Sequence, residues 1–243
     1  MEITFAELGL NERICTGVET LGFDTPTPIQ AAAIPAVLAG KDVVASAQTG
    51  TGKTAAFVLP ALQVIDTDPE GEKTDVPESQ CQPQYDQQQE GQRRRQNRRK
   101  SGRKYNKTRD PQALIVTPTR ELATQIERVA TTICKSTGQR AVIITGGAKL
   151  KRQISAVQAG CDLLVATPGR LLDLIEHHQV SLRNIKVFIL DEADRMLDMG
   201  FWPSVRRIMN TLPSEHQTLL FSATLPPSIT STIDNMLHDP TMI

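Results

Sequence analysis

Short apolar runs alternate along the chain with segments whose apolar residues recur at helical spacing. Six runs are rich in Val, Ile and Leu without polar alternation, as expected for strands covered on both faces; they span residues 42–46, 113–117, 141–145, 162–167, 186–190 and 218–222. Two apolar stripes between them follow one helical face, namely Leu122, Ile126, Val129 and Ile133, and Leu171, Leu172 and Ile175. The pattern predicts an α/β fold with a mostly parallel sheet flanked by helices on both faces.

Residues 66–110 interrupt this pattern with many Gln, Arg, Pro, Glu and Asp residues and almost no large aliphatic ones. The first part is acidic, whereas the stretch from Arg93 to Arg109 holds ten Lys or Arg residues and no acid. Such a composition buries too little apolar surface to offset the entropy lost on ordering. We therefore expect a disordered insertion looping out of a single domain, residues 1–243, rather than a linker between two domains.

The overall composition is that of a soluble protein. Lys plus Arg and Asp plus Glu both number 27, which gives a formal net charge of zero, and 39% of the residues are hydrophobic. No run of about 18 apolar residues predicts a membrane span, and the first ten residues lack the pattern of a secretory signal. The four cysteines, Cys15, Cys81, Cys134 and Cys161, show no metal-binding spacing. We expect reduced thiols and a cytoplasmic location.

Residues 47–54 read Ala-Gln-Thr-Gly-Thr-Gly-Lys-Thr, between an expected strand and an expected helix. This is the context of a phosphate-binding loop, in which Gly50 and Gly52 let backbone N–H groups surround phosphate oxygens. Lys53 would contact the β and γ phosphates, and the Thr54 hydroxyl would bind Mg²⁺. The first position holds Ala47 instead of the usual glycine, and the alternative is a glycine-rich turn without a ligand.

Four residues from Asp191 to Asp194 read Asp-Glu-Ala-Asp directly after an apolar run. A carboxylate at the end of a buried strand can anchor the Mg²⁺ of a bound nucleotide, and Asp191 is the candidate. Glu192 would act as the general base that polarises the attacking water. Taken alone, such a cluster is more often the solvated start of a helix, but the phosphate-binding loop favours the catalytic interpretation.

Together with Gln30 and the Ser-Ala-Thr sequence at 222–224, these motifs resemble the DEAD-box ATP-dependent RNA helicases, in the family's order. The resemblance covers the chain apart from the insertion and implies the N-terminal RecA-like domain of such an enzyme, a P-loop NTPase fold. It also implies ATP and Mg²⁺ as cofactors and RNA as partner. The sequences of residues 47–52 and 200–203 are similar to those of bacterial members of the RhlE-like type.

The resemblance implies that residues 1–30 form the family's adenine-reading Q motif. Phe23 would stack on the base, Thr25 would line the site, and the Gln30 amide would pair with the base edge, since it offers both a donor and an acceptor. Phe5 matches an upstream aromatic of the motif, and the alternative is a plain aromatic residue of the core. The rest of the implied nucleotide-binding set is Gln48, Thr49, Gly50, Thr51, Gly52, Lys53 and Thr54.

Further residues carry implied roles in coupling and RNA binding. Asp194 would accept hydrogen bonds from the hydroxyls of Ser222 and Thr224, which would link the ATP state to the RNA state; a helix cap is the alternative for these hydroxyls. The implied RNA contacts are Pro118, Thr119, Arg120, Gly146, Gly147, Thr167, Pro168, Gly169 and Arg170. Each motif follows an expected strand and precedes a helix, so amides and side chains can meet phosphates with little sequence specificity. The basic stretch at 93–109 would add non-specific RNA affinity, or else only solubility.

The family has a second RecA-like domain that completes the ATP site, and the sequence contains no second phosphate-binding pattern. We therefore expect this chain alone to bind nucleotide, to hydrolyse it very slowly and not to unwind duplexes. Three alternatives remain at this point: another class of P-loop ATPase, an RNA-binding module with a vestigial nucleotide site, and a DNA helicase.

Overall fold

The computed structural model describes residues 3–48, 50–66 and 110–243. These residues belong to one unit, formed by Met1–Asp66 and Thr108–Ile243. The expected insertion therefore lies outside the described residues, apart from its two ends.

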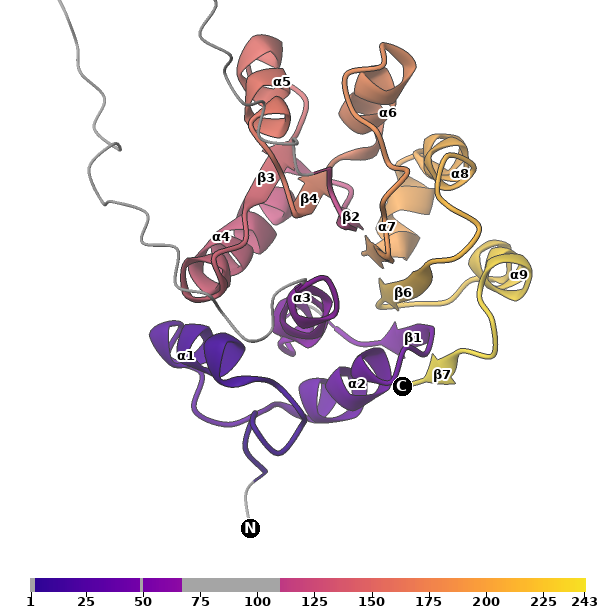
Figure 1. The fold of residues 1–243 in the computed structure, drawn as a ribbon. Coiled ribbons are helices and arrows are strands. Elements are labelled where there is room, and N and C mark those ends of the chain that lie inside the picture. The colour runs from indigo at the N-terminus through magenta and orange to yellow at the C-terminus, as the bar shows by residue number, and fades with distance from the viewer. Residues whose placement is uncertain (1–2, 49, 67–109) are drawn as a thin grey trace, which may run out of the picture. The chain divides into compact units, whose positions relative to one another are not determined.

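A fully parallel sheet forms the centre of this unit (Figure 1). Its strands are β1 (Val43–Ser46), β2 (Ala113–Val116), β3 (Ala141–Ile144), β4 (Leu163–Ala166), β5 (Val187–Asp191), β6 (Gln217–Ser222) and β7 (Thr241–Met242). In the described residues the order across the sheet is β3-β4-β2-β5-β6-β1-β7. All six expected strands are confirmed, and the two-residue edge strand β7 was not predicted because it is too short to form an apolar run.

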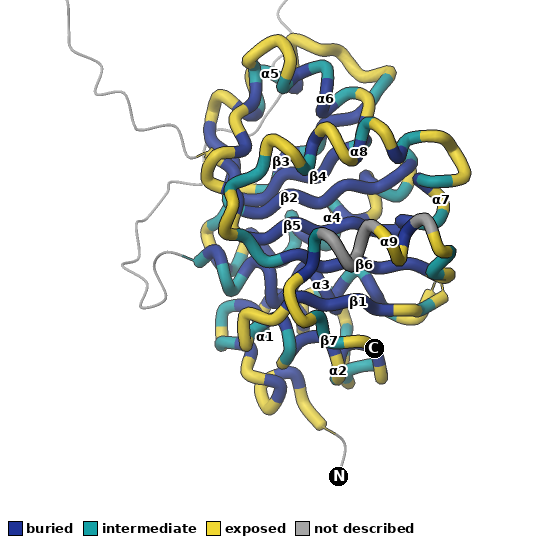
Figure 2. Tube along the Cα trace, turned by 90° about the vertical axis from the view of Figure 1, so that its right-hand side faces the viewer, coloured by how far each residue is buried: buried dark blue, intermediate teal, exposed yellow. Residues whose placement is uncertain are grey.

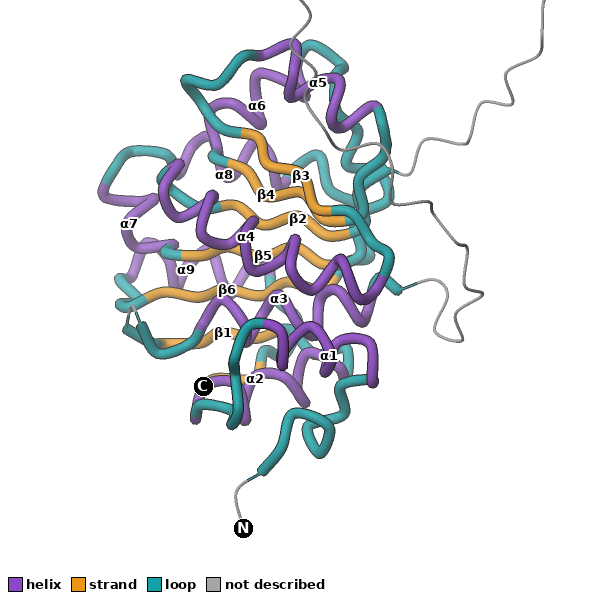
Figure 3. Tube along the Cα trace, turned by 90° about the vertical axis from the view of Figure 1, so that its left-hand side faces the viewer, coloured by secondary structure: helices purple, strands orange, loops and turns teal. Residues whose placement is uncertain are grey.

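Helices cover both faces of the sheet, as predicted. One face carries α1 (Glu12–Thr20), α2 (Pro28–Leu38), α3 (Lys53–Val64) and α4 (Arg120–Thr137) (Figure 3). The other carries α5 (Leu150–Gln158), α6 (Pro168–Glu176), α7 (Ala193–Asp198), α8 (Trp202–Met209) and α9 (Pro227–Met236).

The sheet has one apolar core on each face, and alternate residues of a strand belong to the two cores in turn. In β2, Ala113 and Ile115 pack in the core beneath α1 to α4, whereas Leu114 and Val116 pack on the opposite side. Successive side chains of a strand point to opposite faces, so both sets must be apolar when helices cover both sides. This explains the unbroken apolar runs, and Figure 2 shows the central strands as buried.

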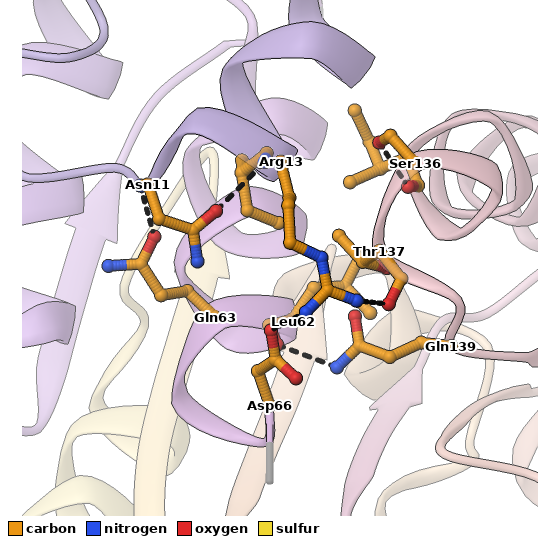
Figure 4. Close-up of polar contacts among 10 residues, drawn as sticks. Asn11, Arg13, Leu62, Gln63, Asp66, Ser136, Thr137 and Gln139 are labelled. Atoms are coloured by element: carbon orange, nitrogen blue, oxygen red, sulfur yellow. Dashed lines mark hydrogen bonds and ion pairs between the residues drawn. The ribbon is translucent and has the colours of Figure 1, made fainter. Parts of the chain in front are cut away.

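Polar contacts join α1 to the far end of α3, opposite Lys53 (Figure 4). The backbone N–H of Asn11 donates to the side-chain oxygen of Gln63 over 2.8 Å. The Arg13 guanidinium lies 3.3 Å from the Asp66 carboxylate and donates to the carbonyl of Thr137. These contacts fix the end of α3 where the described chain stops at Asp66.

Candidate functional site

A cavity of about 650 Å³ lies beside the first turn of α3 and the carboxyl end of β5. Four separate segments line it, namely the loop before α2 with the start of that helix, the loop before α3 with its first turn, one face of α4, and the end of β5. The lining residues are Gly22, Phe23, Asp24, Thr25, Thr27, Gln30, Gly50, Gly52, Lys53, Thr54, Ala55, Leu122, Gln125, Val129, Asp191 and Glu192. The structure thus brings the predicted base-reading, phosphate-binding and acidic residues around one cavity.

The loop before α3 has the backbone shape that its glycines predict. Gly50 and Gly52 adopt φ angles of +89° and +93°, in the left-handed region that favours glycine. A Cβ atom on Gly52 would lie 2.6 Å from the side-chain nitrogen of Gln30, so a larger residue would displace that amide. The predicted loop residues do not all reach the cavity: Gln48 and Thr51 are exposed and outside its lining, and Thr49 lies outside the described residues.

Lys53 is buried at the start of α3, and its ammonium donates a 2.9 Å hydrogen bond to the carbonyl oxygen of Ala47. The carbonyl holds the charged end of the side chain inside the loop. The side chain also lines the cavity. Lys53 is therefore positioned where an anionic group in the cavity would compete for its ammonium.

Gln30 is 4% exposed, and both ends of its amide are engaged. Its oxygen accepts from the backbone N–H of Thr27 over 2.9 Å, which satisfies a free donor at the start of α2. Its nitrogen donates to the carbonyl oxygen of Gly52 over 3.0 Å. The residue predicted to read a base thus also joins α2 to the phosphate-binding loop.

Asp191 and Glu192 end β5 and are buried. Burial raises the pKa of Asp191 to about 6; the nearby ammonium of Lys53 opposes this change, and Glu192 adds to it. Glu192 adopts φ of +53°, a left-handed conformation that costs a non-glycine residue roughly 1–2 kcal/mol. Its carboxylate forms a 3.1 Å ion pair with Arg195. Backbone strain of this kind tends to concentrate at functional sites.

The donor set of the cavity suits Mg²⁺ carried by a nucleotide. The Thr54 hydroxyl and the Asp191 carboxylate both line it, and no group of three or more His, Cys, Asp or Glu side chains in the described part of the chain could hold a metal alone. Mg²⁺ typically binds through one or two protein oxygens, with phosphates and waters as the other ligands.

Asp194 bridges the acidic motif to the segment after β6. Its carboxylate accepts from both the backbone N–H and the hydroxyl of Thr224, each over 2.9 Å, and its own N–H donates to the Ser222 hydroxyl over 3.0 Å. Partial burial would raise the pKa of Asp194, but the hydrogen bonds outweigh it and lower the pKa. Since α9 begins only at Pro227, Thr224 does not occupy its N-cap position.

The predicted RNA-contact residues gather at a second place, the carboxyl ends of the neighbouring strands β2, β4 and β3. Thr119 caps α4 by accepting the N–H of Leu122 over 3.3 Å. The exposed Arg120 guanidinium lies against Gly147, in the space that a Cβ atom would occupy. Arg170 donates to the carbonyl oxygen of Ala148 over 3.3 Å.

The other members of this predicted set take varied positions. Pro118 and Pro168 are buried, Thr167 is half-buried at the N-cap of α6, and Gly169 is exposed in its first turn. Gly146 is half-buried with open space around it. The exposed members of the set are therefore Arg120, Gly147 and Gly169.

Phe5 takes the core position that was one of its two alternatives, whereas the sequence did not predict the lining residues on α4. Phe5 is 5% exposed, packs in the core and is not among the residues that line the cavity. The sequence-based prediction missed Gln125, Leu122 and Val129 as lining residues. Their spacing of three and four along α4 places them on one face, but it does not reveal that this face borders the loop before α3.

Comparison with known proteins agrees with this geometry. Residues 27–232 match the family described as DEAD/DEAH box helicase. The chain belongs to this family. The DEAD-box chain is 38% identical over 240 residues to the RNA helicase CrhR of Synechocystis sp., a match that covers 99% of this chain and 41% of that protein. It is 39% identical to the DEAD-box ATP-dependent RNA helicase RhpA of Helicobacter pylori, with the same coverage.

A solved structure supports the fold of this DEAD-box domain. The crystal structure of a DEAD box protein from Methanococcus jannaschii matches with a TM-score of 0.78 and 32% identity, over 100% of this chain and 56% of that one. The RecA-like fold predicted from the sequence is thereby confirmed. The chain spans about two fifths of the length of the curated relatives it matches. None of the helices in the described ranges has the length and apolar character needed to cross a bilayer.

Proposed function

We propose that this DEAD-box chain is the ATP- and RNA-binding domain of an ATP-dependent RNA helicase. The observation that carries the proposal is the single cavity shared by Gln30, Lys53 and Asp191. These three residues come from α2, α3 and β5, and their convergence would give one cavity a base-reading amide together with a phosphate- and magnesium-binding pair. The names of the relatives, all RNA helicases, agree with this assignment.

The phosphate end of the site would act through charge and position. Lys53 would exchange the Ala47 carbonyl for the β and γ phosphates. Glu192, held by its strained backbone and by Arg195, would orient a water and accept its proton. Mg²⁺, bound through Thr54, Asp191 and the nucleotide, would neutralise the charge that develops on the phosphates.

The second group of motifs would bind RNA by its backbone. Arg120, Gly147 and Arg170 lie at the ends of adjacent strands, where a cation and backbone amides can contact successive phosphates. Contacts to phosphate and 2′-OH carry little base specificity, and those to the 2′-OH discriminate RNA from DNA. The Asp194–Thr224 hydrogen bonds would couple this surface to the nucleotide site.

The complete protein is proposed to contain a second RecA-like domain, because the relatives are about two and a half times longer than this chain. Closure of both domains around ATP and RNA would separate short duplexes. The present chain alone would bind nucleotide, hydrolyse it very slowly and unwind nothing, since the partner domain supplies the arginines that complete the site. We further propose that the protein is of the RhlE-like subtype and that the stretch at 93–109 adds affinity for RNA. We also propose a cytoplasmic location, which the free thiols of Cys15, Cys134 and Cys161 support.

Calorimetric titration of this chain with Mg²⁺–ADP tests the nucleotide site. Wild-type protein should bind, and Lys53→Ala should lose at least tenfold in affinity, because a charge-assisted contact to phosphate is removed. An unchanged affinity in Lys53→Ala would support a vestigial nucleotide site instead.

Matched RNA and DNA single strands separate the remaining alternatives. Preferential binding of RNA supports the RNA helicase, and equal or stronger binding of DNA supports a DNA helicase. A P-loop ATPase of another class would bind neither strand at this surface, and Arg120→Ala would then change nothing.

A further inference from the structure

Helix α4 presents one polar side chain to the nucleotide cavity. Leu122, Gln125 and Val129 line this cavity at positions separated by three and four residues. Such spacing places them on one helical face. Their neighbours Ala123 and Ile126 pack in the core instead. A half-buried apolar pair thus flanks a single amide on the wall of the cavity.

The two amides that line the cavity differ in their availability. Gln30 has its oxygen on the Thr27 N–H and its nitrogen on the Gly52 carbonyl. Gln125 is exposed, and its amide has no hydrogen-bond partner among the described residues. An unengaged amide offers a donor pair and an acceptor without first breaking a contact within the protein.

The remaining lining residues indicate which part of a nucleotide Gln125 would meet. Lys53, Thr54 and Asp191 provide the charge and metal chemistry for the phosphates. Phe23, Leu122 and Val129 are half-buried apolar side chains on the wall of the same cavity. Apolar walls with a small number of placed polar groups are typical of small-molecule sites, and these apolar side chains suit the base rather than the phosphates.

We propose that Gln125 is a second base-reading residue, whose amide hydrogen-bonds to the adenine edge in addition to Gln30. The inference rests on the proposed nucleotide site and adds a specificity determinant on α4. It also places base recognition on the helix whose first turn carries Arg120. The base and the predicted RNA surface would then contact the same rigid element.

The ordinary alternative is that Gln125 is a solvated residue of an amphipathic helix. That alternative predicts no effect of its removal on ligand binding. Since alanine is a good helix former and Gln125 has no partner to lose within the described residues, Gln125→Ala should fold like the wild type. Thermal unfolding of the variant verifies this directly.

The test measures affinities of the 243-residue chain for Mg²⁺–ADP and for purine riboside 5′-diphosphate, which lacks the amino group of adenine. Gln125→Ala is compared with Gln158→Ala, which removes an exposed glutamine of α5 outside the cavity lining. We expect Gln125→Ala to weaken ADP binding about three- to tenfold, the effect of one hydrogen bond. The affinity for the analogue should change little, so the ratio of the affinity for ADP to that for the analogue should be smaller in Gln125→Ala than in the wild type. Gln158→Ala should bind both ligands as the wild type does.

Two results would overturn the inference: unchanged ADP affinity in Gln125→Ala, or an equal loss for ADP and the analogue, which would exclude the amino group as the contact. Lys53→Ala serves as the reference for the site itself. If Lys53→Ala loses ADP while Gln125→Ala does not, the nucleotide site stands and only the role of Gln125 fails. If Lys53→Ala binds ADP normally, the proposed function fails first.

Discussion

The amide nitrogen of Gln30 donates a 3.0 Å hydrogen bond to the carbonyl oxygen of Gly52, so α2 and the phosphate-binding loop are directly joined. The two residues pack so closely that a single added carbon on Gly52 would collide with the Gln30 amide. Loop shape and the position of Gln30 therefore depend on each other.

Replacing Gln30 by Ala should damage both stability and nucleotide binding. The change leaves the half-buried Thr27 N–H without its side-chain acceptor, and an unsatisfied group costs about 1–3 kcal/mol where it is buried. It also removes the link from α2 to the Gly52 carbonyl, which keeps only the hydrogen bond from the Ala56 N–H. We expect a lower melting temperature and at least tenfold weaker ADP binding, measured by thermal unfolding and calorimetry. Gln30→Glu keeps the acceptor for Thr27 but turns a carboxylate oxygen toward the Gly52 carbonyl and adds a negative charge beside the proposed phosphate site, so it should weaken ADP binding further. Wild-type affinity in the Ala variant would disprove a role for Gln30 at the loop.

Replacing Asp191 by Asn should stabilise the unliganded protein at pH 7.5 while weakening Mg²⁺–nucleotide binding. The pKa of Asp191 is raised from 3.8 to about 6, so the fold favours the protonated form. The protonated Asp191 carboxyl therefore contributes fully to the free energy of unfolding below about pH 4, and this contribution is lost as the pH rises through 6. The difference corresponds to about 3 kcal/mol, and Asn can still accept the Glu192 N–H, now 3.1 Å from the Asp191 carboxylate.

Chemical denaturation at pH 4.5 and pH 7.5 measures this effect. The stabilisation should be present at pH 7.5 and mostly absent at pH 4.5. Asp198→Asn, at an exposed position of α7, is the matched control and should change little at either pH. A variant Asp191→Asn no more stable than the wild type at pH 7.5 would show that burial of the charge is not costly here.

Gly147→Ala should weaken RNA binding without changing ADP affinity. Gly147 has φ of +73°, and its added Cβ would push the Arg120 guanidinium aside. Gly40→Ala is a close control, since Gly40 has φ of +75° and open space around it. Both variants should lose roughly 1–2 kcal/mol of stability from the left-handed backbone. Only Gly147→Ala should lower RNA affinity in fluorescence anisotropy, and equal RNA affinities would contradict the predicted role of this loop.

Arg120→Ala should weaken RNA binding to a similar extent for all sequences. One lost phosphate contact on a single strand lowers the log–log salt slope by about 0.7. Anisotropy titrations over a range of salt concentrations measure this slope. Arg120→Lys should restore most of it, and Arg183→Ala, an exposed arginine in the loop before β5, should leave it unchanged. A slope independent of Arg120 would place the RNA path elsewhere.

Much of the fold and of the phosphate-binding loop could be predicted because their signals are local. The six longer strands were found from apolar runs, and left-handed backbone at Gly50 and Gly52 follows from a contiguous loop sequence. The strand β7 gave no such signal, because it is held by hydrogen bonds that the backbone N–H groups of Thr241 and the following Ile243 donate to Asp42 and Val44 of a distant segment. The spacing of residues in α4 likewise predicted the helical face that holds Gln125, but it did not predict that this face lines the cavity.

The sequence by itself determined which segments become strands and helices, and which local motifs follow the strands, because side-chain spacing and backbone preference act between near neighbours. The tertiary structure alone decided that Gln30 reaches Gly52, that Arg120 after β2 meets Gly147 after β3 across the intervening strand β4, and that α4 borders the nucleotide cavity. These contacts depend on the order of strands in the sheet and on how helices pack over it. Both are set by burial of apolar surface across the whole domain, which no short stretch of sequence encodes.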